Sequence, residues 1–554
     1  MAAFSSAGSV QRSARDWRWQ AHCADIIFIA AIALWLIQAA YMVGHVDSWL
    51  DEGLYLIKSA EYVGGRVQPY SLEDATAYPP LFFYILGTAQ ALFGQGHLTG
   101  RLLSVFFALC TLVLLRAAAH RCLQDRLGAG LAVLIYAANP LAVAYMSTAT
   151  PYALTTLLTL SSFLVTAAKP RRPFLQAVTM GVLAAALVLI RLNLAITLPI
   201  FAGLHLFVNR EPPKQALAIL AGAASIAAAL LAISLLIFGR GLLETLMYLP
   251  GLNQILWRFT DIGMEMRDVL KLTTSPTDLQ FNWSVVGEVA NRFFLQLYPV
   301  LLLPAIPGGL LSLIHVRRQP LTAFCTFYFI VMTVAHLFGS QSYCPPCLMA
   351  YANYFLPFAA IPASLFLTAM ALKFTLPVAA AGLILFIAAG GYFTATRSRL
   401  GLLIPKPWSN PLVHVQRLAQ PLRQLLPKGR ILVLSGKYQT VQAAWLAGGF
   451  VEPYSVSLLP NLREPLDSLD AAAKAAAHRI LRLRGFRDST ALIQDLERPM
   501  AAIVLQEEPA MAATLAPYIG ATRAEQVESI LRQRYTRIGE GSEDSGTVSV
   551  WVPK

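Results

Sequence analysis

The chain has 554 residues, of which 56% are hydrophobic and 13% charged, with a formal net charge of +13. Soluble domains carry roughly 25% charged residues, so this composition excludes an ordinary water-soluble enzyme and indicates a membrane protein. Lys and Arg concentrate in the cytoplasmic loops of such proteins. The positive charge therefore predicts topology, and no nucleic-acid partner is expected.

Eleven or so apolar segments are expected to span the membrane, because a spanning helix needs about 20 apolar residues. They cover residues 25–43, 100–119, 128–147, 152–168, 174–190, 194–208, 215–238, 293–314, 320–338, 354–371 and 375–394. The expected fold class is mainly α, a polytopic transmembrane bundle over residues 1–394.

The connecting segments sort by charge into two sides, and the positive-inside rule makes the basic side cytoplasmic. This sorting requires that residues 79–94 do not cross. The segment is short and begins with Pro79-Pro80, so we expect a helix that lies on the membrane surface or re-enters it. The outward side then receives a large first loop over 44–99, a second over 239–292 and a short one over 339–353.

From residue 395 to 554 the composition predicts a small soluble α/β domain. Its expected strands cover 430–435, 500–505 and 547–552, and its expected helices 438–447 and 469–484. An odd number of spans places this domain outside, although Arg397, Arg399 and Lys406 favour the cytoplasm.

The first outward loop carries six acids: Asp47, Asp51, Glu52, Glu61, Glu73 and Asp74. In a helix, Asp47 and Asp51 would share a face and repel each other unless a cation or a substrate compensates. Ionisable residues beside apolar spans are candidates for function, and a carboxylate there could accept a proton. A divalent metal held by His45, Asp47 and Asp51 is an alternative, but the absence of an Asp-x-Asp motif favours a site without metal.

The segment Trp49-Leu-Asp-Glu-Gly-Leu-Tyr55 resembles the Asp-Glu motif of GT-C glycosyltransferases, most closely the branch of protein O-mannosyltransferases and lipid A aminoarabinose transferases (glycosyltransferase family 39-like). Four further segments resemble motifs of this family in the same order: 78–84, 100–104, 150–154 and 353–357. The chain departs from the family at Tyr78, Thr150 and Asn353, where relatives often carry a cation.

The resemblance implies an inverting transferase that moves a sugar from a polyprenyl-phosphate donor to a hydroxyl of an envelope glycolipid, polysaccharide or protein. It places the enzyme in a bacterial-type cytoplasmic (inner) membrane, with the site and the C-terminal domain facing the periplasm. Asp51 is the expected base and Glu52 its neighbour, holding the acceptor or orienting Asp51.

The other residues implied by this resemblance fall into two groups. Donor-phosphate binding is expected from Arg101, Arg191, Tyr78, Tyr152, Arg258 and Arg267. Acceptor binding or support of the site is expected from Asp47, His45, Tyr55, Asn193 and Tyr354. For Arg101 and Arg191, at the outward ends of spans, a snorkelling interfacial cation is the alternative interpretation.

Two questions stay open at this point. Cys344-Pro-Pro-Cys347 lies in the short outward loop, where a local disulfide would persist. A transporter or flippase of lipid-linked sugars is the alternative function, although transporters usually show paired halves and no internal repeat is evident here. A scaffold subunit is a third possibility.

Overall fold

A computed structural model gives the architecture of the protein. In the N-terminal part it describes residues 14–45, 50–69, 78–169, 171–208, 212–239, 287, 290, 301–339 and 351–371. In the C-terminal part it describes residues 411–435, 438–448, 450–451, 462–463, 487–498, 500–507, 511–543 and 546–554.

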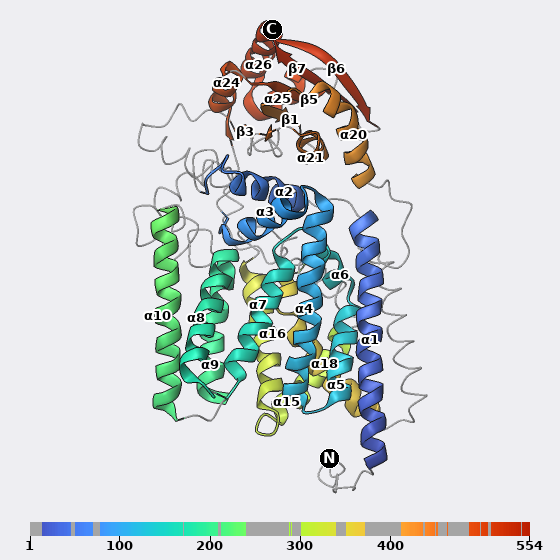
Figure 1. Cartoon of the computed structure of the whole chain (residues 1–554), viewed down its shortest axis with the longest axis vertical. Helices are drawn as coiled ribbons and strands as arrows, with labels where there is room; N and C mark the ends of the chain where they lie inside the picture. The colour runs from blue at the N-terminus through green and yellow to red at the C-terminus, as the bar shows by residue number, and fades with distance from the viewer. Residues whose placement is uncertain are drawn as a thin grey trace.

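The N-terminal part is a membrane-embedded bundle of roughly parallel helices (Figure 1). Four described helices are long and apolar enough to cross a membrane: α1 (Ala14–His45), α4 (His97–Leu123), α8 (Pro173–Ile190) and α10 (Pro213–Phe238). Shorter apolar helices stand beside them: α5 (Arg126–Ala137), α7 (Tyr152–Ala167), α9 (Thr197–Val208), α15 (Leu303–Ile314), α16 (Pro320–Gly339) and α18 (Leu356–Ala371). The prediction of a mainly α, polytopic bundle is confirmed.

Some predicted spans are interrupted, and the interruptions have local causes. The span expected over 128–147 divides into α5 and α6 (Pro140–Met146). Asn139 Oδ1 accepts hydrogen bonds from the backbone N–H groups of Leu141 and Ala142. An Asn cap followed by proline at the first helical position favours a new helix start. The span expected over 375–394 lies outside the described residues.

The segment expected to stay at the surface forms α3 (Leu81–Phe93), which packs against α2 (Leu50–Val63). Both helices lie across one end of the bundle (Figure 1). Their approach is close, because a Cβ on Gly87 would lie 2.1 Å from the carbonyl oxygen of Ser59. The pair therefore forms a layer over the ends of the spans.

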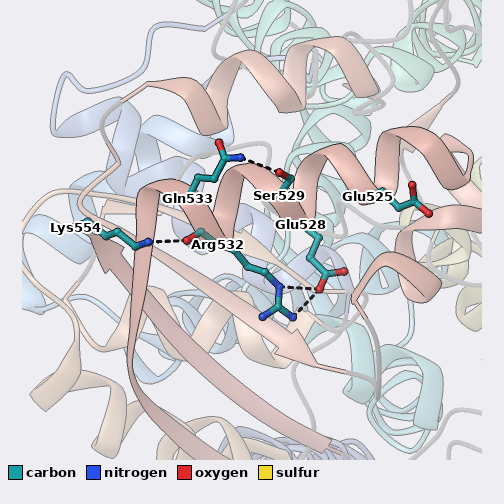
Figure 2. A pocket seen from close by; sticks show the side chains of 6 residues that line it. All are labelled: Glu525, Glu528, Ser529, Arg532, Gln533 and Lys554. Carbon is teal, nitrogen blue, oxygen red and sulfur yellow. Dashed lines mark hydrogen bonds and ion pairs between the residues drawn. The ribbon is translucent and has the colours of Figure 1, made fainter.

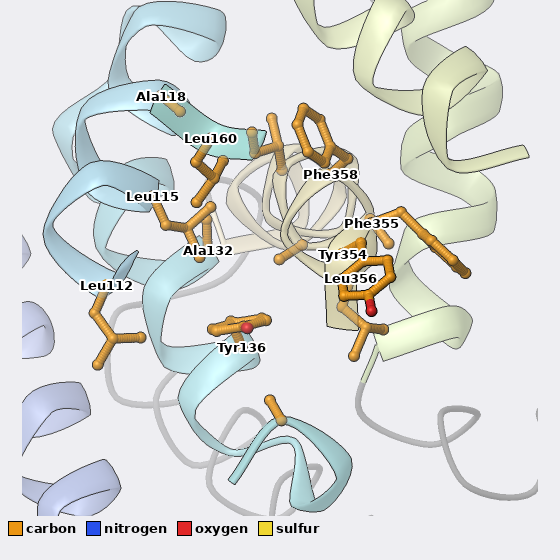
Figure 3. Close-up of a cluster of buried hydrophobic side chains, with 14 of the residues drawn as sticks. Leu112, Leu115, Ala118, Ala132, Tyr136, Leu160, Tyr354, Phe355, Leu356 and Phe358 are labelled. Carbon is orange, nitrogen blue, oxygen red and sulfur yellow. The ribbon is translucent and has the colours of Figure 1, made fainter. Parts of the chain in front are cut away.

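The bundle core is built around α18, whose residues from Leu356 to Ser364 are all buried. Figure 3 shows apolar side chains of α4, α5 and α7 on one side of α18. A Cβ on Gly308 of α15 would lie 1.8 Å from the carbonyl oxygen of Pro362. Only a residue without a side chain allows these two helices to meet at that point.

The C-terminal part contains a five-stranded sheet in the order β2-β1-β5-β7-β6. Strands β1 (Arg430–Leu434), β2 (Phe450–Val451) and β5 (Ala502–Glu507) are parallel, whereas β6 (Tyr535–Glu543) and β7 (Gly546–Pro553) pair in antiparallel fashion. The three expected strands therefore form as β1, β5 and β7, and the sheet adds β2 and β6 to them. The helices are α20 (Pro411–Leu425), α21 (Tyr438–Leu446), α24 (Ser489–Glu497), α25 (Met511–Ile519) and α26 (Ala521–Arg534). The expected helix 469–484 lies outside the described residues.

This α/β part sits on the layer formed by α2 and α3, at the opposite end of the bundle from the N-terminus (Figure 1). One apolar cluster joins the two parts, because it includes Leu56 of α2, Phe83 of α3, Leu418 of α20 and Val441 of α21. Helices α2 and α3 are consequently enclosed between the bundle below and the α/β domain above.

Candidate functional site

Helix α2 begins at Leu50 and carries Asp51, Glu52 and Tyr55. The side chain of Asp51 lies outside the described residues, but its place on the helix is defined. Positions four apart share one helix face, so Asp51 and Tyr55 occupy the same face of α2. Glu52, one position on, is fully buried.

Glu52 forms a buried, bidentate ion pair with Arg101 of α4. Arg101 Nε donates to Glu52 Oε1 at 2.8 Å, and Arg101 Nη2 donates to Glu52 Oε2 at 2.7 Å. The backbone N–H of Ala149, in the turn before α7, donates to Glu52 Oε1 at 2.8 Å. Arg101 Nη1 donates to the carbonyl oxygens of Met42 and Val43, which belong to the last turn of α1.

The pair therefore joins four segments: the end of α1, the start of α2, the second turn of α4 and the turn before α7. The last carbonyls of a helix have no partner within the helix, and a cation there also interacts favourably with the helix dipole. Most hydrogen-bonding groups of Arg101 are engaged within the protein. This geometry makes Arg101 and Glu52 supports of α2, and leaves Arg101 little capacity to hold a donor phosphate.

The charge state of Glu52 follows from the same contacts. Burial alone would raise the pKa of Glu52, but the charge and hydrogen bonds of Arg101, together with the Ala149 N–H, bring the pKa below its ordinary value. A carboxylate that is ionised and occupied by three donors is poorly placed to accept a further proton. Of the two acids in the motif, Asp51 remains the candidate base.

Arg191 occupies the break between α8 and the short 3-10 helix η2 (Leu192–Ile196). Its backbone is extended, with φ −148° and ψ 108°, so the helix stops there. The side chain is buried, and Arg191 Nη2 donates to the Tyr55 hydroxyl at 2.6 Å. Arg191 Nε makes no hydrogen bond to any described residue.

Four tyrosine rings surround the Arg191 guanidinium, and we call them the tyrosine cage. The guanidinium carbon lies 5.8 Å from the ring centroid of Tyr55, 5.6 Å from that of Tyr78, 5.4 Å from that of Tyr152 and 5.6 Å from that of Tyr351. These separations fall within the range of cation–π attraction.

A fifth tyrosine, Tyr354, extends the cage. It is fully buried, stacks on Tyr351 with centroids 5.9 Å apart and lies 5.9 Å from the Tyr152 ring. Tyr354 belongs to the 3-10 helix η6 (Ala352–Tyr354). The cage thus collects aromatic rings from the first loop, α7 and the segment before α18.

The structure brings together five predicted site residues: Arg191, Tyr55, Tyr78, Tyr152 and Tyr354. Asn193 lies two residues beyond Arg191 in η2; it is partly buried, and its Oδ1 makes no hydrogen bond to a described residue. Arg101 is held apart from this group by its contacts with Glu52. Tyr351 was missed, because a lone tyrosine before the Asn353-Tyr354 segment carries no distinguishing signal.

The remaining candidates lie outside the described residues. These are Asp47, Arg258, Arg267, Cys344 and Cys347, together with the side chain of His45. Among the described residues no group of three His, Cys, Asp or Glu side chains could hold a metal ion. The proposed metal site at His45, Asp47 and Asp51 depends on side chains beyond that description, so it stays a prediction.

A surface hollow of about 650 Å³ lies on α26 beside the C-terminal Lys554 (Figure 2). It is lined by short-range pairs, such as Arg532 with Glu528 at 2.7 Å. It lies on the side of the α/β domain that faces away from the bundle (Figure 1). Its charged and solvated lining is typical of an ordinary domain surface.

No protein-family model matches the chain, and no curated protein sequence matches it. Solved structures do match. ArnT from Cupriavidus metallidurans bound to undecaprenyl phosphate is similar with a TM-score of 0.58 at 13% identity, covering 95% of this chain and 97% of that one. The apo state of the same ArnT gives a TM-score of 0.52 at 13% identity, with the same coverage.

The apo oligosaccharyltransferase of Archaeoglobus fulgidus is also similar, with a TM-score of 0.50 at 12% identity. That comparison covers 98% of this chain and 75% of the archaeal one. Together these likenesses show that the protein has the GT-C fold over almost its whole length. At such low identity they concern the fold alone.

Proposed function

We propose that the protein is an inverting glycosyltransferase that moves a sugar from a polyprenyl-phosphate donor to a hydroxyl group on the outer face of the cytoplasmic membrane. The acceptor belongs to an envelope glycolipid, a polysaccharide or a protein. The observation that carries the proposal is Arg191, a buried guanidinium in the tyrosine cage. Its neighbour Tyr55 lies on the same face of α2 as Asp51.

A buried charge is costly unless it is paired, yet no carboxylate pairs with Arg191 within the described residues. Its one hydrogen-bond acceptor there is the neutral Tyr55 hydroxyl. An anionic ligand would supply the missing charge, and the free Nε–H would donate to it. Guanidinium groups suit phosphate oxygens because their donors form a planar fork. The likeness to an ArnT bound to undecaprenyl phosphate supports a polyprenyl phosphate as the anionic partner of the protein.

In the proposed reaction, the acceptor oxygen attacks the anomeric carbon of the sugar from the face opposite the phosphate. The acceptor proton passes to the Asp51 carboxylate, a new carbon–oxygen bond forms, and the bond from the anomeric carbon to the phosphate oxygen breaks. Polyprenyl phosphate leaves and the anomeric configuration inverts. Arg191 stabilises the negative charge that grows on the phosphate, in a site where low dielectric strengthens the interaction.

The test uses a deletion strain and mass spectrometry of its glycolipids and envelope glycans. We expect a defined sugar to be missing, and to return when the wild-type chain is supplied. Asp51→Asn should leave it missing while the purified variant still binds undecaprenyl phosphate. Arg191→Gln should lose both the sugar and that binding. Restoration of the sugar by Asp51→Asn would refute the proposed base, and restoration by both variants would refute this active site.

A matched control is Arg116→Gln, a second arginine of the bundle. Arg116 lies on α4 and pairs with Asp25 at the surface of the bundle. We expect this variant to bind undecaprenyl phosphate and restore the sugar like the wild type. The comparison separates loss of a specific guanidinium from loss of one positive charge.

A further inference from the structure

The start of α2 is in contact with α21 of the α/β domain, and the side chain of Gln442 lies against the α2 backbone at Gly53. A Cβ on Gly53 would lie 2.2 Å from Gln442 Nε2 and 2.7 Å from the amide carbon of Gln442. The Gln442 side chain is therefore pressed against the α2 backbone one residue after Glu52. It is 1% exposed, so the contact is inside the protein.

Gln442 also reaches α4. Its Oε1 lies 3.0 Å from His97 Nε2. A carbonyl oxygen only accepts hydrogen bonds, so His97 Nε2 carries the proton and donates it. His97 is buried in the first turn of α4, one turn before Arg101, and it interacts electrostatically with Glu52. Gln442 thus touches both helices that the Glu52–Arg101 pair joins.

We infer that Gln442 is a positioning residue through which the α/β domain fixes the first turn of α2, and with it Asp51, for the transfer reaction. The inference rests on the proposed function. Without the Gln442 side chain, the start of α2 would be held from the bundle side by Arg101 but would lack this contact from the α/β domain. Displacement of a reacting group by about 1 Å can lower a rate by two orders of magnitude, so a domain contact of this kind can control turnover without touching substrate.

The apolar contacts of the same helix provide a control. Val441 is fully buried in the cluster that joins α20 and α21 to α2 and α3. Val441→Ala removes docking contacts without removing the bond to His97. It should lower the melting temperature of the full chain and leave the amount of transferred sugar near the wild-type level.

The experiment compares Gln442→Ala, Gly53→Ala, their double variant and Gln442→Glu as full-length proteins. Gln442→Ala should lower the restored sugar about tenfold and speed hydrogen exchange in the first turn of α2. Gly53→Ala should do the same, because its Cβ displaces the Gln442 amide. In the double variant the Gln442 amide is already absent, so the new Cβ at position 53 has nothing to displace. The fold-loss of transferred sugar should therefore equal that of Gln442→Ala alone and not the product of the fold-losses of the two single variants. Gln442→Glu retains the acceptor for His97 and should recover part of the activity.

The inference is overturned if Gln442→Ala transfers sugar like the wild type, or if its loss merely follows its melting temperature as in Val441→Ala. Additive effects of Gly53→Ala and Gln442→Ala would also overturn it, since residues that share a contact are expected to be non-additive. Failure of the proposed function is recognised separately. In that case Asp51→Asn restores the sugar, while the hydrogen-exchange coupling between positions 53 and 442 persists.

Discussion

Glu52 and Arg101 face each other across the start of α2 and α4, with both side chains fully buried and two parallel hydrogen bonds of 2.8 and 2.7 Å between them. Arg101 also holds the last carbonyls of α1. Glu52, the second acid of the motif, thus stabilises the fold through Arg101, and Asp51, the first acid, is the proposed base.

The ion pair is expected to contribute strongly to the stability of the fold. Arg101→Ala leaves the Glu52 carboxylate buried and unpaired, and breaking such a pair typically costs about 3–5 kcal/mol. We expect a much lower unfolding temperature, or no folded protein in detergent. Arg101→Lys should recover only part of the loss, because a lysine cannot form the planar fork.

The comparison for this prediction is Arg116→Ala on the same helix, whose partner Asp25 is 55% exposed. Exposed pairs contribute about 0–1 kcal/mol. A similar loss of stability in both variants would show that the buried pair has no special role.

Stability should fall in acid because of Glu52. Its folded-state pKa lies below the ordinary value of 4.5, so the carboxylate stabilises the fold fully above that value. This contribution is lost as the pH drops through the lower, folded-state pKa. Glu52→Gln should therefore show a flatter dependence of unfolding temperature on pH below 4.5 than the wild type. Parallel curves for the two proteins would argue against an ionised Glu52.

The Tyr55 hydroxyl should affect ligand affinity through Arg191. Tyr55→Phe keeps the ring of the cage but removes the acceptor that orients Nη2. Hydrogen bonds to charged groups contribute about 1.5–3 kcal/mol, so we expect undecaprenyl phosphate to bind roughly tenfold more weakly. Tyr62→Phe is the control, since Tyr62 lies on the same helix and packs on Phe83, outside the cage. Equal affinities of both variants would contradict this assignment.

The contact between α15 and α18 should tolerate no side chain at Gly308. Gly308→Ala would place Cβ against the carbonyl oxygen of Pro362, and overpacking of this kind costs about 1–3 kcal/mol. Gly203→Ala, on α9, has open space around the new Cβ and should be neutral or stabilising by about 0.5–1 kcal/mol. Thermal unfolding of the two variants in detergent checks the difference.

Much of the architecture can be predicted from the amino-acid sequence. Runs of about 20 apolar residues and the placement of Lys and Arg predict α1, α4, α8 and α10, because hydrocarbon admits only helices whose backbone bonds are satisfied internally. Short apolar segments in the C-terminal part likewise predict β1, β5 and β7. The break at Asn139 was missed, because the surrounding sequence is apolar enough for one continuous span.

The candidate site divides in the same way. The sequence by itself determined that Asp51 and Glu52 are adjacent and follow the first span, and that Arg191 interrupts an apolar stretch. The tertiary fold placed the two acids in the first turn of the short helix α2. The tertiary structure decided which of these groups meet. It pairs Glu52 with Arg101 and packs Gln442 against Gly53. It also surrounds Arg191 with tyrosines that are as far apart in the sequence as Tyr55 and Tyr351. Such contacts join residues separated by up to several hundred positions, and they depend on how the helices and the α/β domain pack, which no local pattern of hydrophobicity or spacing records.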